Sequence, residues 1–193
     1  MTPQMTKNSD SPEMRSGFVG IIGAPNAGKS TFLNQVLGQK ISITSKKPQT
    51  TRDRILGIIN RPASQIIFVD TPGIHKSSSL LNQRIVDQAM QALEDVDLIL
   101  FVVDSAFRNH SAEKMIISKL AKTAKPAILA LNKIDLVKKA DVYSLVEQFQ
   151  DCHDFKAVVP ICAKKNIQTD RLLDEIEEHL EKGPKLFPDD TFT

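Results

Sequence analysis

The stretch that decides the fold is Gly23-Ala24-Pro25-Asn26-Ala27-Gly28-Lys29-Ser30. It fits the pattern G-x-x-x-x-G-K-[ST], in which a glycine-rich turn leaves a strand and opens a helix. The largely apolar run Phe18–Ile22 precedes it, and a helical apolar period that ends against Gly38 follows it. Backbone N–H groups at such a turn can cradle phosphate, while Lys29 supplies a positive charge and Ser30 a hydroxyl for magnesium. The sequence therefore predicts a phosphate-binding loop between the first strand and the first helix.

A second motif indicates which base is bound. Asn132-Lys133-Ile134-Asp135 follows the apolar run Ala127–Leu131, so it lies at the carboxyl end of a strand, where ligands of α/β folds bind. A carboxylate there can accept from N1–H and the exocyclic amine of guanine, which adenine lacks. The stem of Lys133 can cover the base, and Asn132 can tie this turn to the phosphate loop. A solvated surface turn can have the same four residues, but their place after a phosphate-binding loop favours guanine recognition.

A third motif, Asp70-Thr71-Pro72-Gly73, ends the third β-rich run. The Asp70 carboxylate can hold a magnesium-bound water, and the Gly73 amide can reach a γ phosphate. Proline and glycine also end strands in ordinary turns. The order of the three motifs along the chain favours the nucleotide site.

Short apolar runs alternate with amphipathic stretches along the chain, which is typical of an α/β protein. The predicted strands are Phe18–Ile22, Ile55–Asn60, Gln65–Val69, Leu98–Val103, Ala127–Leu131 and Ala157–Ile161, and the predicted helices carry Phe32–Leu37, Leu81–Ala89, Met115–Leu120, Val142–Phe149 and Leu172–Leu180. Asp141 stands where the N-cap of the fourth helix belongs. Residues 61–64 are too few for a helical crossover, so the second and third runs should form an antiparallel hairpin. We expect a P-loop NTPase fold with a six-stranded, mainly parallel sheet, one antiparallel edge strand and helices on both faces.

Composition excludes several other classes of protein. The chain has 193 residues, 41% hydrophobic and 25% charged, which fits one globular domain. Its 25 basic and 23 acidic residues give a net charge of +2, too small to favour DNA as a partner. Cys152 and Cys162 follow no metal or disulfide pattern, so reduced thiols are expected. The first sixteen residues lack an apolar signal segment, and the longest apolar run, Leu98–Val103, is far shorter than the about 18 residues that span a bilayer. These features predict a cytoplasmic location.

The motifs carry a family resemblance. Gly23–Thr31, Asp70–Gly73, Asn132–Asp135 and Cys162-Ala163-Lys164 are similar to the first, third, fourth and fifth signature motifs of translation-factor-class GTPases. Within that class, the run Gln39–Arg52 resembles the Era family. The resemblance implies a Ras-like G domain over residues 17–183 that switches between GTP and GDP and hydrolyses GTP with Mg²⁺.

The resemblance also implies roles for individual residues. The nucleotide contacts that it implies are Gly23, Asn26, Ala27, Gly28, Lys29, Ser30, Thr31, Asn132, Lys133, Asp135, Cys162, Ala163 and Lys164. It implies catalytic roles for Lys29, Thr51 and Gly73, and magnesium ligation by Ser30, by Thr51 and, through a water, by Asp70. Ala163 would donate its backbone amide to the guanine oxygen. Asn26 is similar to the asparagine that coordinates K⁺ in related GTPases, although a plain turn residue would look the same.

The chain departs from the family pattern at several positions. Cys162 replaces the usual serine, which puts a side-chain hydrogen bond in doubt. Ile74 stands where many regulatory GTPases carry a water-positioning glutamine, so backbone groups, substrate or a cation must orient the water and slow turnover is expected. His75, nearby, is more typical of a bystander than of a base.

The Era resemblance implies 16S rRNA and the 30S subunit as partners, and it leaves open a peripheral association with the inner membrane. The family's RNA-binding KH domain, with its G-x-x-G loop, is absent, so we expect a flexible tail at 1–16 and only the start of a linker at 184–193. A natural short form and a piece of a longer protein fit equally well. Two alternatives remain open: a sibling assembly or tRNA-modification GTPase of the Der or MnmE type, and an RNA-interaction module with little turnover. The basic stretch Lys40–Arg54 supports the second, but a solvated switch loop explains it as well.

Overall fold

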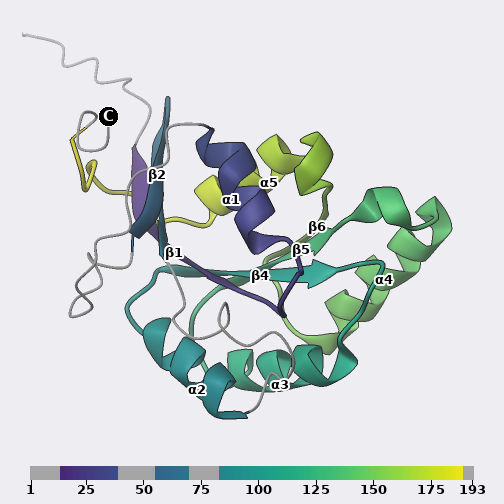
Figure 1. Cartoon of the computed structure of the whole chain (residues 1–193). Coiled ribbons are helices and arrows are strands. Elements are labelled where there is room, and N and C mark those ends of the chain that lie inside the picture. The colour runs from purple at the N-terminus through teal and green to yellow at the C-terminus, as the bar shows by residue number, and fades with distance from the viewer. Residues whose placement is uncertain (1–13, 39–54, 70–82, 189–193) are drawn as a thin grey trace, which may run out of the picture.

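A computed structural model of the chain describes residues 14–38, 55–69 and 83–188. Its six strands form one sheet in the order β2-β3-β1-β4-β5-β6 (Figure 1). The strands are β1 (Arg15–Ile22), β2 (Ile55–Arg61), β3 (Ser64–Val69), β4 (Leu98–Asp104), β5 (Ala127–Asn132) and β6 (Ala157–Pro160). Every neighbouring pair is parallel except β2 with β3. The predicted sheet, with its antiparallel edge strand, is confirmed.

The hairpin of β2 and β3 closes through a two-residue connection. Arg61 pairs with Ser64, and the register holds to Gly57 opposite Phe68, where a bulge shifts it. A connection of this length can only join antiparallel strands, because a parallel pair needs a crossover of a dozen or more residues. The hairpin therefore places β2 at the edge of the sheet.

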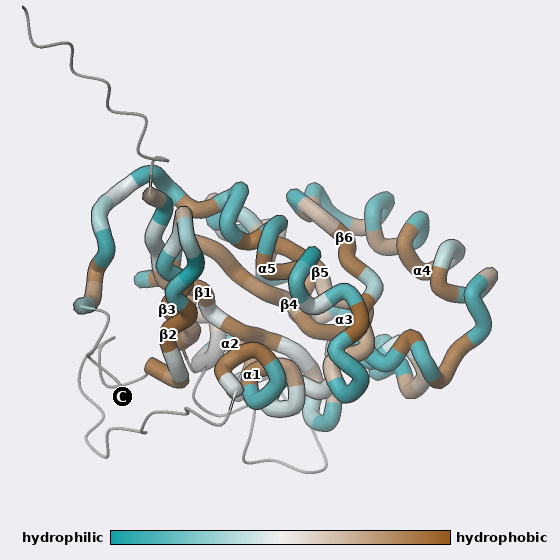
Figure 2. Tube along the Cα trace, turned by 90° about the horizontal axis from the view of Figure 1, so that it is seen from above, coloured by the Kyte–Doolittle hydropathy of each residue, from teal (hydrophilic) through white to brown (hydrophobic). Residues whose placement is uncertain are grey.

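Helices cover both faces of the sheet, as predicted. They are α1 (Lys29–Leu37), α2 (Gln83–Ala92), α3 (His110–Leu120), α4 (Lys139–Cys152) and α5 (Thr169–Glu178), with short 3₁₀ turns η2 (Ile134–Leu136) and η3 (Ala163–Lys165). Helices α1 and α5 pack on one face, and α2, α3 and α4 contribute to the core on the other (Figure 1). All residues of β3, β4 and β5 are buried, and Figure 2 shows these strands as a hydrophobic layer with hydrophilic residues on the surrounding helices. Burial on both faces explains why these strands are nearly continuous in apolar residues.

The ends of the helices test the capping predictions. Gly38 follows α1 with φ +66° and ψ −161°, a positive-φ conformation that favours glycine but differs from the left-handed helical geometry usual for a terminating glycine. The prediction that Asp141 caps α4 is wrong, because the helix already begins at Lys139, after the extended residue Lys138. Asp141 lies in the first turn, where a negative charge still stabilises a helix through its dipole. Asp141 therefore indicated the first turn of the helix correctly but not its first residue.

Segments from the two ends of the described chain lie together. The Gly183 amide donates to the Met14 carbonyl at 2.9 Å, and the Ser16 hydroxyl donates to the Pro184 carbonyl at 2.7 Å. The predicted domain boundaries at 16/17 and 183/184 therefore fall within a packed region, and they stay predictions. Among the described residues, no helix is both long and apolar enough to cross a membrane.

Candidate functional site

The motif residues in the described part of the chain gather at the carboxyl ends of the parallel strands. The loop after β1 carries the phosphate-binding motif, the turn after β5 carries Asn132–Asp135, and the turn after β6 carries Cys162–Lys164. Strands β1 and β5 both flank β4, which sets the distance between the first two motifs. Thr51, Asp70 and Gly73 lie outside the described residues, so their predicted roles stay predictions.

The two motif glycines of the loop occupy positions that exclude a side chain. Gly28 has φ +99°, and a Cβ there would lie 2.1 Å from the Asn132 Nδ2 atom. A Cβ on Gly23 would lie 2.3 Å from the Val102 carbonyl oxygen. The loop therefore packs its backbone directly against β4 and the Asn132 side chain. Because the N-cap of α1 is a glycine, its side chain does not cap the first turn, and the positive end of the helix dipole faces the loop, which favours an anion there.

Lys29 points back into the loop that precedes it. Its side-chain Nζ donates to the carbonyls of Gly23 at 2.8 Å and Ala24 at 2.9 Å. The residue is 5% exposed although it carries a charge. A buried ammonium needs such acceptors, and here they hold the positive charge within the curve of the loop. This is the position from which it can meet phosphate oxygens.

Asn132 joins all three motifs of the described site. It is 2% exposed at the end of β5, and its Nδ2 donates to the Ala27 carbonyl at 2.9 Å. Its Oδ1 accepts from the backbone N–H of Ala163 at 3.0 Å. The predicted tie between Asn132 and the phosphate loop is confirmed. The Ala163 amide already has this partner, so its predicted donation to the guanine oxygen requires a shared hydrogen and stays a prediction.

The Asp135 carboxylate has two donors. The Cys162 thiol donates to Oδ1 at 3.0 Å, and Lys165 Nζ lies 3.1 Å from Oδ2. The thiol hydrogen bond, followed by Lys165, holds the pKa of Asp135 below its usual value. Asp135 is therefore an acceptor at neutral pH, and its charge-dependent contacts are lost only as the pH falls through that lowered pKa. Cys162 makes the side-chain hydrogen bond that its replacement of serine had put in doubt.

The fifth motif brings one further residue to the site. Lys164 is exposed in η3, and its contact with nucleotide stays a prediction. The next residue, Lys165, forms the ion pair with Asp135. Sequence reasoning missed Lys165 because the motif pattern ends one position earlier. Its only signal was a second lysine next to the first.

Asp104 is a second residue that the motifs did not indicate. It ends β4, opposite Asn132 in the register, and its Oδ2 lies 2.6 Å from Lys133 Nζ. Lys133 itself has φ +64°, so a left-handed residue opens the turn that carries Asp135. The available signal was an acidic residue that follows directly on a buried strand, at the edge of the sheet where ligands bind.

Three of the nucleotide contacts predicted in and after the loop have exposed side chains. Asn26, Ser30 and Thr31 are exposed, Asn26 with φ +62° at the tip of the loop. Ala27 is buried beneath them. The loop thus presents hydroxyl and amide oxygens outward, the donor atoms that Mg²⁺ and K⁺ prefer.

This fold and this arrangement of motifs define a P-loop GTPase. The chain belongs to the family of 50S ribosome-binding GTPases, whose model matches residues 18–133. It is similar to the GTPase Era of Geobacter metallireducens (strain ATCC 53774 / DSM 7210 / GS-15), with 48% identity over 185 residues that cover 96% of this chain and 62% of the relative.

Solved structures of Era give the same picture. A crystal structure of Era with MgGDPNP and nucleotides 1506–1542 of 16S ribosomal RNA matches with a TM-score of 0.73 and 40% identity over 92% of this chain and 61% of that one. A tyrosine-to-alanine variant of Aquifex aeolicus Era bound to GDP·AlF4⁻ also has a TM-score of 0.73 at 40% identity, over 93% of this chain and 62% of that one. The chain thus spans about six tenths of the length of these relatives.

Proposed function

We propose that this chain is a GTP-binding switch that hydrolyses GTP to GDP and phosphate. The observation that carries the proposal is the junction at Asn132, whose amide contacts the phosphate loop on one side and the fifth motif on the other. This junction links the loop proposed to hold the phosphates to the turns proposed to hold the base. The Era structures with MgGDPNP and with GDP·AlF4⁻ support the same ligand class at 40% identity.

Guanine recognition rests on Asp135. Its ionised carboxylate accepts hydrogen bonds, and guanine presents two adjacent donors to it. Lys133 covers the base with its aliphatic stem, and Cys162 and Lys165 keep the carboxylate charged. Adenine presents its N1 acceptor at the same edge. Two acceptors cannot form a hydrogen bond with each other, so the site discriminates against adenine.

The phosphates lie in the loop of residues 23–31. Backbone N–H groups donate hydrogen bonds to the phosphates, and Lys29 neutralises part of their charge. The residues of this segment that we propose contact the nucleotide are Gly23, Asn26, Ala27, Gly28, Lys29, Ser30 and Thr31. The exposed hydroxyl of Ser30 at the start of α1 fits a magnesium ligand. Thr51 and, through a water, Asp70 would complete the magnesium site. When bound, Mg²⁺ would supply positive charge that neutralises the phosphates.

Hydrolysis in this proposal depends on few side chains. Gly73 would contact the γ phosphate with its amide, and Ile74 beside it can neither donate nor accept a hydrogen bond. Turnover by the chain alone is therefore slow, and Asn26 with K⁺ is the proposed source of additional positive charge.

The biological setting follows from the same relatives. The Era structure contains part of 16S ribosomal RNA, so we infer a role in assembly of the small ribosomal subunit, in the cytoplasm, for the protein to which this chain corresponds. We also propose that this protein can associate peripherally with the inner membrane.

Single-turnover hydrolysis tests the proposed activity. Excess protein is mixed with GTP, Mg²⁺ and K⁺, and released phosphate is followed over time. Phosphate release by the wild-type chain and its loss in Lys29→Ala are expected, because Lys29 neutralises the transferred phosphoryl group. Saturated binding of GTP with no phosphate release would leave a binding module and contradict the enzyme assignment.

A further inference from the structure

The Asp104 carboxylate, at the end of β4, divides its two oxygens between two tasks. Oδ1 accepts from the backbone N–H groups of Ala106 at 2.9 Å and Phe107 at 3.0 Å, which shapes the turn after the strand. Oδ2 accepts from Nζ of Lys133, the residue that follows the neighbouring strand β5, at 2.6 Å. One oxygen builds the turn, and the other holds a lysine of the guanine-recognition motif.

The burial of this ion pair distinguishes it from ordinary surface pairs. The Asp104 side chain is 10% exposed and that of Lys133 29%. Lys119 and Asp87 form a pair of the same length, 2.6 Å, but Asp87 is 47% exposed. Exposed pairs contribute little, whereas a pair shielded from water keeps more of its Coulomb energy. The Asp104–Lys133 contact therefore restrains the lysine stem more strongly.

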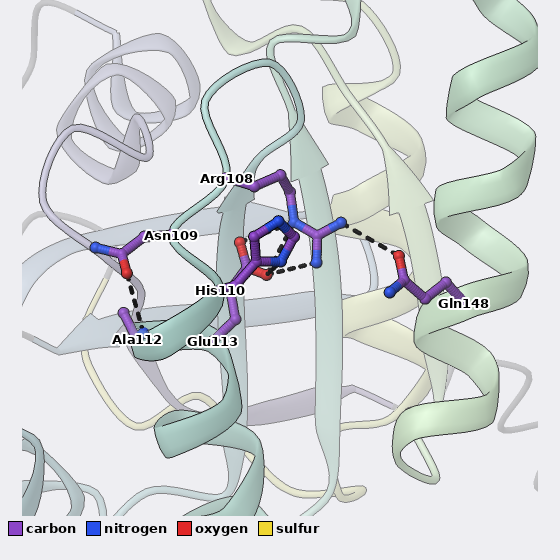
Figure 3. Close-up of polar contacts among 6 residues, drawn as sticks. All are labelled: Arg108, Asn109, His110, Ala112, Glu113 and Gln148. Atoms are coloured by element: carbon purple, nitrogen blue, oxygen red, sulfur yellow. Dashed lines mark hydrogen bonds and ion pairs between the residues drawn. The ribbon is translucent and has the colours of Figure 1, made fainter.

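The loop that Asp104 opens is also fixed at its far end (Figure 3). Arg108 donates to Glu113 at 2.5–2.9 Å and to Gln148 Oε1 at 3.3 Å, and its guanidinium lies 4.7 Å from the centre of the Phe149 ring. Asn109 caps α3 by accepting from the Ala112 N–H at 3.1 Å. Residues 104–109 thus form a bridge between β4, α3 and α4. Asp104 is the fixed partner, and Lys133 takes its position from it.

We propose that Asp104 is a positioning residue for recognition of the guanine base. It keeps the Lys133 stem extended beside Asp135, in the conformation that covers the base, before nucleotide arrives. The inference rests on the proposed function and adds to it a residue outside the signature motifs. Without Asp104, a stem with four rotatable bonds must be ordered on binding, and we expect GDP to bind about tenfold more weakly.

The test is a double-mutant cycle in the full chain. Asp104→Asn keeps an oxygen for the Ala106 and Phe107 N–H groups and removes the charge that faces Lys133. Affinities for GDP, ADP and pyrophosphate are measured for the wild type, Asp104→Asn, Lys133→Met and the double variant, and thermal unfolding without nucleotide shows that each folds. Asp104→Ser, a smaller acceptor, replaces Asp104→Asn should that variant fail to fold. Asp87→Asn is the matched control, because it breaks an ion pair of equal length away from the site.

Positioning predicts a specific pattern. Asp104→Asn lowers the affinity for GDP about tenfold and leaves the affinity for pyrophosphate unchanged, because the phosphate loop is intact. In the Lys133→Met background it has no further effect on the affinity for GDP. Asp87→Asn changes none of these affinities. An equal loss in both backgrounds, a parallel loss for pyrophosphate, or no loss for GDP would overturn the inference. A wild-type chain that binds ADP as tightly as GDP would contradict the proposed function itself, and the inference with it.

Discussion

Among single residues, Asp135 is the one that we expect to select guanine over other bases. Replacement by Asn changes one acceptor oxygen into a donor that faces the guanine donors, so GDP should bind about a hundredfold more weakly. Xanthosine diphosphate, with a carbonyl in place of the exocyclic amine, should gain affinity. Calorimetric titration of both nucleotides checks this exchange, and Asp170→Asn, an exposed acid in α5, serves as the control. Unchanged affinity for GDP would remove Asp135 from the site.

The two cysteines should differ sharply in reactivity. Both are free thiols, but Cys152 is exposed and Cys162 is 1% exposed. Burial, and then the hydrogen bond to Asp135, raises the pKa of Cys162, so it stays a protonated and poorly nucleophilic donor at neutral pH. Mass spectrometry after brief treatment with iodoacetamide should find Cys152 modified and Cys162 intact. Equally rapid labelling of both would mean that the turn around Cys162 opens freely.

Among the elements, the β2–β3 hairpin is anchored at the end of the sheet away from the nucleotide. Arg61 forms ion pairs with Asp174 at 2.5 Å and Glu177 at 2.9 Å of α5, and the Ser64 hydroxyl donates to Glu177 at 2.7 Å. At the opposite end of the hairpin, β2 begins four residues after Thr51 and β3 ends one residue before Asp70, the two predicted magnesium ligands. The hairpin therefore connects α5 to the segments that the family resemblance assigns to nucleotide sensing.

Gln65 in β3 holds the segment that follows α5. It is fully buried, its Oε1 accepts from the backbone N–H groups of Leu186 and Phe187, and its Nε2 donates to the Phe187 carbonyl at 2.8 Å. Gln65→Ala should release this segment and lower the free energy of unfolding by about 1–2 kcal/mol, because buried polar groups lose their partners. Hydrogen exchange should accelerate at residues 186 and 187, while the exposed control Gln91→Ala leaves exchange there unchanged. Unaltered protection in Gln65→Ala would show that other contacts hold the segment.

Monovalent cations should affect turnover by the molecule as a whole. Asn26 is exposed at the tip of the phosphate loop, and Ile74 offers no polar group to the reaction. We expect faster hydrolysis in K⁺ than in Na⁺, and no difference between the salts for Asn26→Gly, which keeps the left-handed backbone at φ +62° and removes the amide. Single-turnover rates in matched salts measure this, and equal wild-type rates would exclude the proposed cation role.

Across the whole chain, short sequence patterns predicted the architecture well, but they did not predict contacts between residues far apart in the sequence. Apolar runs and the short link at 61–64 predicted the sheet and its antiparallel edge, and the motifs at 23–30 and 132–135 predicted which strand ends meet at the site, since these features depend on neighbouring residues. The Asp104–Lys133 pair and the Gln65 clamp join residues 29 and more than 100 positions apart, and no periodicity encodes such partners. The misplaced cap at Asp141 has a different cause, because α4 begins after Lys138 without a side-chain cap, so a capping residue does not mark its start.

In our proposal, one preassembled site recognises guanine and phosphate together. The most direct test is the affinity of the wild-type chain for GDP, GTP, ADP and ATP with Mg²⁺, measured by calorimetry under one set of conditions. Both guanine nucleotides should bind at least about a thousandfold tighter than their adenine counterparts, because adenine presents an acceptor to the Asp135 carboxylate where guanine presents two donors. Comparable affinities for the guanine and adenine nucleotides would contradict the proposal.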